Sequence, residues 1–368
     1  MLFWIAGILF ILKNLKSIFG LLKNSSQNEE SIMKKQFNIL RFAFLFTTIV
    51  YLTSFGQTSQ EKYLGQEPPR MTAKIFMPGL VTTGLPTRDM AITPDGKEMY
   101  FTVHGSTYLF SVILCSKFID GKWQKPEVAP FSKNPKFAYT EPCISPDGKK
   151  MYFVSNRSKT SPSGEKESYD VWMMDRINDG WSEPVNIGEP INSATDEYFP
   201  SVTNSGTMYF TREAADRSNA IYRSKLVDGK YAEAEKLPEQ INFGADRFNA
   251  FIDPEEKYII VSVFRAKDGK GAADYYIVFR NSDDTWQNPI NMGDKINSKF
   301  NEYSPYVTRD GKYFFFMSMK PDENLFKENE NFSYDWLQKI HNSPGNGSNT
   351  MYWIDAQFIN ELKTNSSK

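Results

Sequence analysis

The sequence predicts an all-β chain that forms a single β-propeller. Three observations lead to this prediction: a strand-rich unit repeats five times, aromatic residues are frequent, and an isolated strand precedes the first repeat. Aromatic residues make up 15% of the 368 residues, and such side chains favour pleated, half-buried surfaces. Hydrophobic residues at 40% and charged residues at 24% are typical of a globular chain.

The repeat is visible as a tight turn followed by an aromatic strand. Its clearest copy reads EPCISPDGKKMYFVSNR, from Glu141 to Arg157. The residues that align at the turns of the five copies are Asp95, Asp147, Ser205, Glu255 and Asp310. They are separated by 52, 58, 50 and 55 residues. Because Pro presets φ, Asp bonds its own backbone and Gly accepts positive φ, each copy predicts a β-hairpin.

Two further strands follow each hairpin. The third is clear in YDVWMM from Tyr169, and the fourth in DGWSEPVNIG from Asp179. Three copies then continue with an Ile-Asn or Ile-Asn-Ser element, beginning at Ile191, Ile241 and Ile296. A sheet of four strands cannot bury both faces alone, whereas sheets stacked around an axis can. We therefore predict five four-stranded blades, with six as the alternative.

The two ends of the repeat region predict how the ring closes. The fifth copy has its third strand, Met351–Ala356, but no fourth strand, and an isolated equivalent, Ala73–Val81, precedes the first copy. We expect this N-terminal strand to complete the last blade. The fifth copy also contains a long polar insertion, Pro321–Asn349, which is expected to be functional or mobile. The predicted organisation is an N-terminal extension with a signal peptide over 1–56, a linker over 57–72, the propeller over 73–360 and a tail over 361–368.

The first 56 residues predict export. From Met33 the chain has a basic start, an apolar stretch to about Leu52 and small residues before Gln57, which is the order of a secretory signal peptide. We expect translation to begin at Met33, cleavage after Gly56, and a periplasmic or extracellular protein. The alternative is a membrane anchor that includes residues 1–24. Membrane contact is expected only through this N-terminal segment, if it stays uncleaved.

Composition excludes several classes of function. With 43 basic and 44 acidic residues, no basic field is available to bind nucleic acid. The two Cys and two His form no CxxC or HExxH pattern, so we expect neither a metal nor a cofactor. Cys115 and Cys143 are expected to be buried free thiols, and a disulfide between them is the alternative in an oxidising compartment.

The repeated S-P-D-G-K-x-M-Y-F pattern resembles the WD-like propeller repeat of the TolB family of exported bacterial proteins. Ser145–Phe153 matches it best, whereas Thr203–Phe210 lacks the Pro-Asp pair. The DGxWSxPxNIG strand resembles variants in exported proteins of the Bacteroidetes type. The resemblance spans about residues 73–356 and implies a propeller fold, but propellers support many unrelated functions. The additional domain and sixth blade of TolB are not apparent, so its role in the envelope does not carry over.

Charged residues recur where the innermost strand of each copy begins, which is expected to be the mouth of the central channel. The candidate ligand-binding residues are Arg88, Glu141, Glu197, Arg247 and Glu302. Carboxylates and arginines could orient a sugar, a peptide or a cation there. The alternative is that these residues cap strand ends and bond to neighbouring blades. His104 is expected to be a surface residue, and the recurring Trp and Tyr residues of the strands are expected to form the core between sheets.

We therefore expect an exported, non-enzymatic binding or scaffold protein that recognises an envelope protein, a peptide or a glycan at the channel mouth. One alternative is a carbohydrate-active enzyme, a glycoside hydrolase or polysaccharide lyase, that uses the same carboxylates with Tyr139, Tyr198 or Tyr303. An acid pair that converges on a deep pocket would favour the enzyme, and a shallow charged ring would favour binding. Another alternative is a structural component of the envelope, which predicts one large apolar patch.

Overall fold

The computed structural model describes residues 62–161, 163–178, 180–327 and 332–366. The predicted signal peptide, its cleavage site and Met33 lie outside these residues. Residues 62–368 form one compact unit. Among the described residues, no helix is long and apolar enough to cross a membrane.

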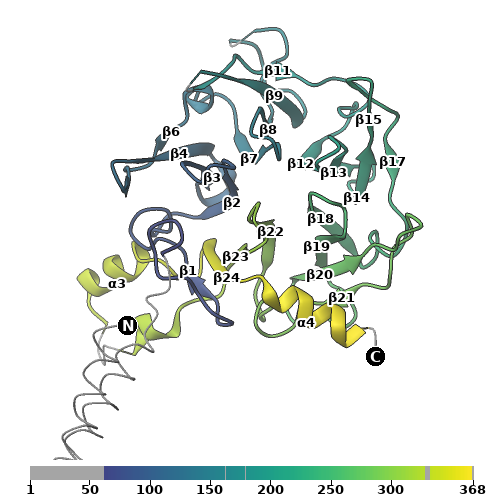
Figure 1. Cartoon of the computed structure of the whole chain (residues 1–368). Coiled ribbons are helices and arrows are strands. Elements are labelled where there is room, and N and C mark those ends of the chain that lie inside the picture. The colour runs from purple at the N-terminus through teal and green to yellow at the C-terminus, as the bar shows by residue number, and fades with distance from the viewer. Residues whose placement is uncertain (1–61, 162, 179, 328–331, 367–368) are drawn as a thin grey trace, which may run out of the picture. The chain divides into compact units, whose positions relative to one another are not determined.

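Five antiparallel sheets stand around a central axis as five blades, as predicted (Figure 1). The three long strands of each blade follow one another in chain order from the axis outward. The innermost strands are β2 (Thr87–Ile92), β7 (Tyr139–Ile144), β12 (Glu197–Val202), β18 (Asp246–Ile252) and β22 (Glu302–Val307). The second strands are β3 (Glu98–His104), β8 (Lys150–Ser155), β13 (Met208–Glu213), β19 (Tyr258–Phe264) and β23 (Tyr313–Ser318). The third strands are β4 (Ser111–Ile119), β9 (Asp170–Ile177), β14 (Asn219–Ser224), β20 (Ala273–Phe279) and β24 (Thr350–Asp355).

Short outer strands complete the blades. They are β5 (Lys122–Trp123), β6 (Glu127–Val128), β10 (Gly180–Trp181), β11 (Val185–Asn186), β17 (Glu235–Lys236) and β21 (Ile290–Asn291). In the third blade, β15 (Leu226–Val227) and β16 (Lys230–Tyr231) form a separate two-stranded hairpin.

The N-terminal strand closes the ring, as predicted. Strand β1 (Lys74–Ile75) pairs antiparallel with β24 of the fifth blade, and Phe76 N donates to Met351 O at 2.9 Å. The side chain of Phe76 is fully buried and packs edge-on against Phe315 and Trp353. Helix α4 (Gln357–Ser366) follows β24, and its Phe358 is buried in the core between the fourth and fifth blades.

The core is divided among five clusters, one at each contact between neighbouring blades. The strand aromatics fill these clusters as predicted: Tyr209, Tyr152, Trp172 and Trp286 are buried, whereas Trp123 and Trp181 are half-buried. The Ile-Asn-Ser elements explain how blades connect. In the second blade, for example, Asn192 bonds both backbone groups of Val171 in strand β9 and so fastens the connection to its own blade.

Both cysteines are free thiols on different blades, each half-buried. Burial raises the pKa of the Cys115 thiol to about 11 and that of Cys143 to about 12. The expected free thiols are what the structure contains.

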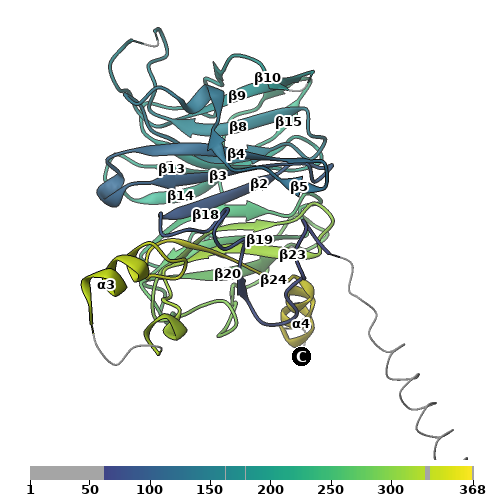
Figure 2. The same ribbon diagram turned by 90° about the vertical axis from the view of Figure 1, so that its left-hand side faces the viewer.

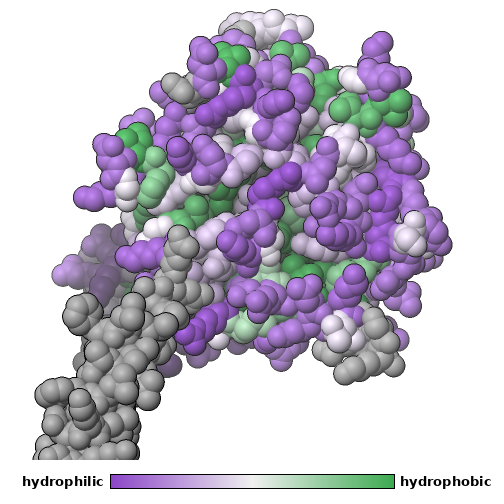
Figure 3. All heavy atoms as spheres, in the orientation of Figure 1, coloured by the Kyte–Doolittle hydropathy of each residue, from purple (hydrophilic) through white to green (hydrophobic). Residues whose placement is uncertain are grey.

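The two faces of the propeller carry different elements. Figure 2 shows α3 (Tyr334–His341), from the insertion in the fifth blade, on one side, and the β5, β10 and β15 hairpins toward the other. Figure 3 shows the hairpin side, where hydrophilic residues dominate and hydrophobic residues form small separate groups. This face therefore does not carry the single large apolar patch expected of a structural envelope component.

Candidate functional site

Every innermost strand contains a β-bulge at the same position. The pairing register shifts there in all five blades, and the bulged residue has a positive φ. These residues are Asp89 (φ 59°), Glu141 (55°), Phe199 (49°), Asn249 (49°) and Ser304 (63°). Such backbone geometry is uncommon for residues other than glycine. Because it recurs in every blade, the geometry belongs to the construction of the ring rather than to a single site.

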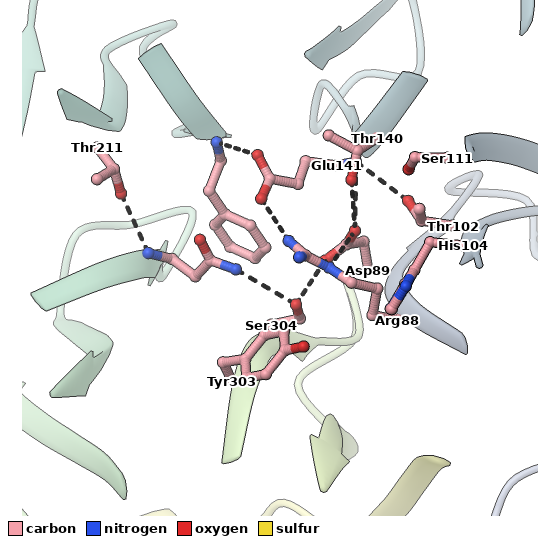
Figure 4. A network of polar contacts seen from close by, with 12 residues as sticks. Arg88, Asp89, Thr102, His104, Ser111, Thr140, Glu141, Thr211, Tyr303 and Ser304 are labelled. Atoms are coloured by element: carbon pink, nitrogen blue, oxygen red, sulfur yellow. Dashed lines mark hydrogen bonds and ion pairs between the residues drawn. The ribbon is translucent and has the colours of Figure 1, made fainter. Parts of the chain in front are cut away.

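The bulged residues hydrogen-bond from blade to blade around the axis, and we call this set with Arg88 the axial ring (Figure 4). Asp89 accepts from Thr140 Oγ1 at 3.1 Å, and Glu141 Oε2 accepts from Phe199 N at 2.7 Å. Thr211 Oγ1 accepts from Asn249 N at 3.1 Å. The ring closes where Asn249 Nδ2 donates to Ser304 Oγ at 3.3 Å and Ser304 Oγ donates to Asp89. All five blades are therefore joined at the axis by polar contacts.

Arg88 supplies the positive charge of the axial ring. Its Nε donates to the Asp89 carboxylate at 2.8 Å, and its Nη2 donates to Glu141 Oε1. The guanidinium also lies over the ring of Tyr303, 5.0 Å from its centroid. Burial alone would lower the pKa of Arg88, but Asp89 and Glu141 raise it well above its ordinary value. Arg88 therefore stays charged and compensates the buried carboxylate of Asp89, and that of Glu141 when Glu141 is ionised.

Burial raises the pKa of Glu141 to about 7, although the charge of Arg88 opposes this shift. The folded protein therefore holds a proton on Glu141 in a range where the unfolded chain, with an ordinary value of 4.5, has lost it. The stabilisation associated with this proton is complete below about pH 4.5 and is lost as the pH rises through 7.

We expect the Glu141→Gln variant not to lose stability in this way as the pH rises. Between pH 4.5 and 8, the wild type should lose on the order of 2 kcal/mol of unfolding free energy relative to the variant. Urea unfolding at several pH values measures the difference, with Glu239→Gln at an exposed position as the control. Parallel pH profiles for the wild type and Glu141→Gln would show that Glu141 does not titrate in this way.

One aromatic side chain from each blade lies at the channel mouth, and we call these the mouth aromatics: Tyr108, Tyr169, Tyr198, Phe248 and Tyr303. Tyr198, Phe248 and Tyr303 occupy the same position on their strands as Arg88, directly before the bulged residue. The ring centroids of Tyr169 and Tyr198 are 5.5 Å apart, and those of Phe248 and Tyr303 are 6.1 Å apart. The hydroxyls of Tyr108 and Tyr303 are 3.3 Å apart. Tyr108 is 52% exposed, and the other four are half-buried.

His104 supports this arrangement from below Tyr108. The two rings are stacked 4.3 Å apart, and the imidazole lies 2.9 Å from both Gly105 O and Asn349 Nδ2. The partners assign the tautomer, since Nδ1–H must donate to the carbonyl and Nε2 must accept from the amide. Asn349 also donates to Tyr303 OH at 2.6 Å. Burial lowers the pKa of His104, so a neutral imidazole orients Tyr108, and the expectation of a surface histidine is wrong.

The structure brings together two of the five candidate residues, Arg88 and Glu141. Glu197 and Glu302 are instead fully buried, with their carboxylates enclosed by donors from their own blade connections. Glu197 accepts from Ser193 N, Ser193 Oγ and Arg212 Nε at 2.6–3.0 Å. Glu302 accepts from Ser298 and Ser318. Neither carboxylate is open to a ligand, and both have the strand-capping role that we considered as the alternative.

Arg247 is half-buried at the position that aligns with Glu197 and Glu302. Its Nε is buried and has no hydrogen-bond partner among the described residues. The structure therefore does not join Arg247 to the axial ring.

Two cavities lie elsewhere. An apolar cavity of about 60 Å³ is lined by the residues that follow the bulge on the inner strands, among them Met90, Pro142, Pro200 and Pro305. The axial ring therefore separates the mouth from this part of the channel. A larger groove of about 980 Å³ lies between the second and third blades, and its lining includes Tyr152, Tyr231 and Leu226. The described residues contain no cluster of three or more His, Cys, Asp or Glu that could hold a metal ion.

The chain is similar to known proteins in its fold only. No family model matches the chain, and no curated protein matches it. Similar solved structures include a TolB-type protein from Agrobacterium tumefaciens, which is 14% identical with a TM-score of 0.42 over 64% of this chain and 70% of that one. TolB from Acinetobacter baumannii is 15% identical, with a TM-score of 0.40 over 74% of this chain and 57% of that one. A glycoside hydrolase is 12% identical, with a TM-score of 0.48 over 77% and 92%.

The fold is a five-bladed β-propeller. Five sheets around one axis and the repeated Pro-Asp-Gly turns carry this assignment, and the likeness to the solved structures concerns the fold alone. Because the chain spans 57% of the second TolB, the activity and partners of that whole protein do not follow from the likeness.

Proposed function

We propose that this TolB-like propeller is an exported, non-enzymatic binding or scaffold protein that recognises its ligand, a glycan or a segment of a partner protein, at the channel mouth. The observation that carries the proposal is the set of mouth aromatics, one from each blade, around a single arginine. Aromatic side chains with a polar end provide large, rigid contact areas at low entropic cost.

The state of the carboxylates favours binding over hydrolysis or lyase chemistry. A glycosidase needs two carboxyl groups that face the scissile bond of a bound sugar. Asp89 and Glu141 instead face Arg88 and the amide and hydroxyl donors of neighbouring blades, and both are less than 5% exposed. Their hydrogen-bonding capacity is used within the axial ring, which leaves them no free position for an acid or a base.

A thermal-shift screen against oligosaccharides, peptidoglycan fragments and peptides tests the proposal, because a ligand that binds only the folded protein raises the melting temperature. We expect a ligand-induced shift that Phe248→Ala abolishes and that Leu226→Ala, a change in the groove, preserves. We also expect no cleavage of the bound ligand. A shift that survives Phe248→Ala but disappears in Leu226→Ala would place the site in the groove, and product release would support the enzyme.

A further inference from the structure

The charge pattern at the channel mouth restricts the ligand. Arg88 Nε and Nη2 are engaged with Asp89 and Glu141, but Nη1 donates to no residue of the described chain. Nη1 is also not among the fully buried polar atoms that lack a partner, so it is the guanidinium nitrogen that remains for a ligand, although Arg88 as a whole is only 7% exposed. The centre of the site therefore offers N–H donors from a charged guanidinium.

Neither a cation nor an anion matches this arrangement. A cationic group placed over the mouth aromatics would approach the charged guanidinium of Arg88. An anionic group that accepts from Nη1 would approach the carboxylate of Asp89 and also that of Asp196, which accepts from Tyr198 OH at 2.9 Å. Like charges at such short range, partly shielded from water, are unfavourable. An uncharged ligand with oxygen acceptors avoids both repulsions.

The shape of the site favours flat rings over peptide side chains. Directly beneath the mouth, Asp89, Glu141, Asn249 and Ser304 are all less than 5% exposed and bonded to one another. They close the channel, so no deep pocket receives an anchoring side chain of the kind that a bound peptide strand or helix uses. A sugar ring presents one face of C–H groups that packs on an aromatic ring and a rim of hydroxyls that accept hydrogen bonds.

We propose that the channel mouth binds an uncharged oligosaccharide, with sugar rings packed on Tyr198 and on the Phe248–Tyr303 pair and a hydroxyl that accepts from Arg88 Nη1. This inference rests on the proposed binding function and specifies its ligand class. At least two aromatic groups on different blades serve as platforms: Tyr169 with Tyr198, and Phe248 with Tyr303. A chain of sugars, rather than a single one, is therefore the expected ligand.

Isothermal titration calorimetry tests the ligand class and the stacking contact together. The panel contains cellohexaose, xylohexaose and mannohexaose as neutral probes, acidic oligogalacturonate, and a set of unrelated peptides. We expect at least one neutral hexasaccharide to bind and oligogalacturonate not to bind. Tyr198→Ala should weaken binding at least tenfold, whereas Tyr198→Phe, which keeps the ring, should stay within about threefold of the wild type. Circular dichroism melts verify that both variants fold.

The outcomes separate the ligand class from the binding function. Binding of oligogalacturonate or a peptide that Tyr198→Ala weakens would refute the neutral glycan and retain the mouth as a binding site. Binding of a neutral glycan that neither Tyr198→Ala nor Phe248→Ala weakens would show that the glycan does not bind at the channel mouth. Failure of every oligosaccharide to bind would overturn the glycan assignment, and the peptide titrations would then decide whether the binding function stands.

Discussion

Replacement of Arg88 by methionine is expected to lower the free energy of unfolding by about 3–5 kcal/mol, because it leaves the buried Asp89 carboxylate without a compensating charge and removes the partner of Glu141. Asp89 is 2% exposed and Glu141 is 4% exposed, and both contact the guanidinium. Methionine keeps much of the side-chain volume, so the loss of charge dominates. Urea unfolding measures the effect, and Arg217→Met is the matched control because its ion pair with Glu213 is exposed and longer, at 3.6 Å.

The mechanism also predicts a rescue. If uncompensated charge causes the loss, the double variant Arg88→Met with Asp89→Asn should be more stable than Arg88→Met alone, since the buried carboxylate has become a neutral amide. Additive destabilisation in the double variant would instead attribute the effect of Arg88 to packing, and the electrostatic account of the axial ring would be wrong.

The second large effect concerns ring closure, where Phe76→Ala is expected to cost about 3–5 kcal/mol. Phe76 is fully buried, and its ring centroid lies 4.7 Å from that of Phe315 and 5.4 Å from that of Trp353. Truncation removes the side chain that fixes the N-terminal strand to the last blade. Phe332→Ala, at a position that is 81% exposed, is the control and should stay within about 0.5 kcal/mol of the wild type. A small effect of Phe76→Ala would mean that the closing strand contributes little to stability.

The fold could be predicted from the sequence because its determinants repeat. The Pro-Asp-Gly turns place the inner hairpins, and the five copies predict five blades, with six as the alternative that the structure rules out. The isolated strand before the first copy matched the missing strand of the fifth, and the pairing of Ile75 with Tyr352 confirms that match. Repetition helps because every copy has the same local geometry. The hairpin at an irregular copy, such as Thr203–Phe210, can therefore be predicted from the other four copies.

The site could be predicted only in part, because strand alignment does not show which way a side chain points near a bulge. Aligning the residues at which the innermost strands begin identified the end of the channel where the axial ring lies. It also identified two members of that ring, Arg88 and Glu141. The bulge adds a residue to the inner strand and changes which neighbours face the axis. Glu197 and Glu302 therefore point into blade connections, and the residue after each of them, Tyr198 or Tyr303, lies at the mouth.

Three further residues near the mouth, Tyr108, His104 and Asn349, carry no repeat signal. Tyr108 lies in a short 3₁₀ helix between β3 and β4, and Asn349 ends the insertion of the fifth blade. His104 meets them only in the folded ring, 245 residues away from Asn349 in the chain. Contacts of such separation between unrelated loops leave no local pattern in a single sequence.

The most direct test of the account is hydrogen–deuterium exchange of the full chain with and without the tightest-binding neutral hexasaccharide of the panel, at saturation. The account predicts slower exchange in residues 104–111, 196–199, 247–250 and 302–305, which carry the mouth residues, and unchanged exchange in residues 203–206 and 226–231 of the groove. Protection that is confined to the groove segments, with unchanged exchange at the mouth, would contradict it.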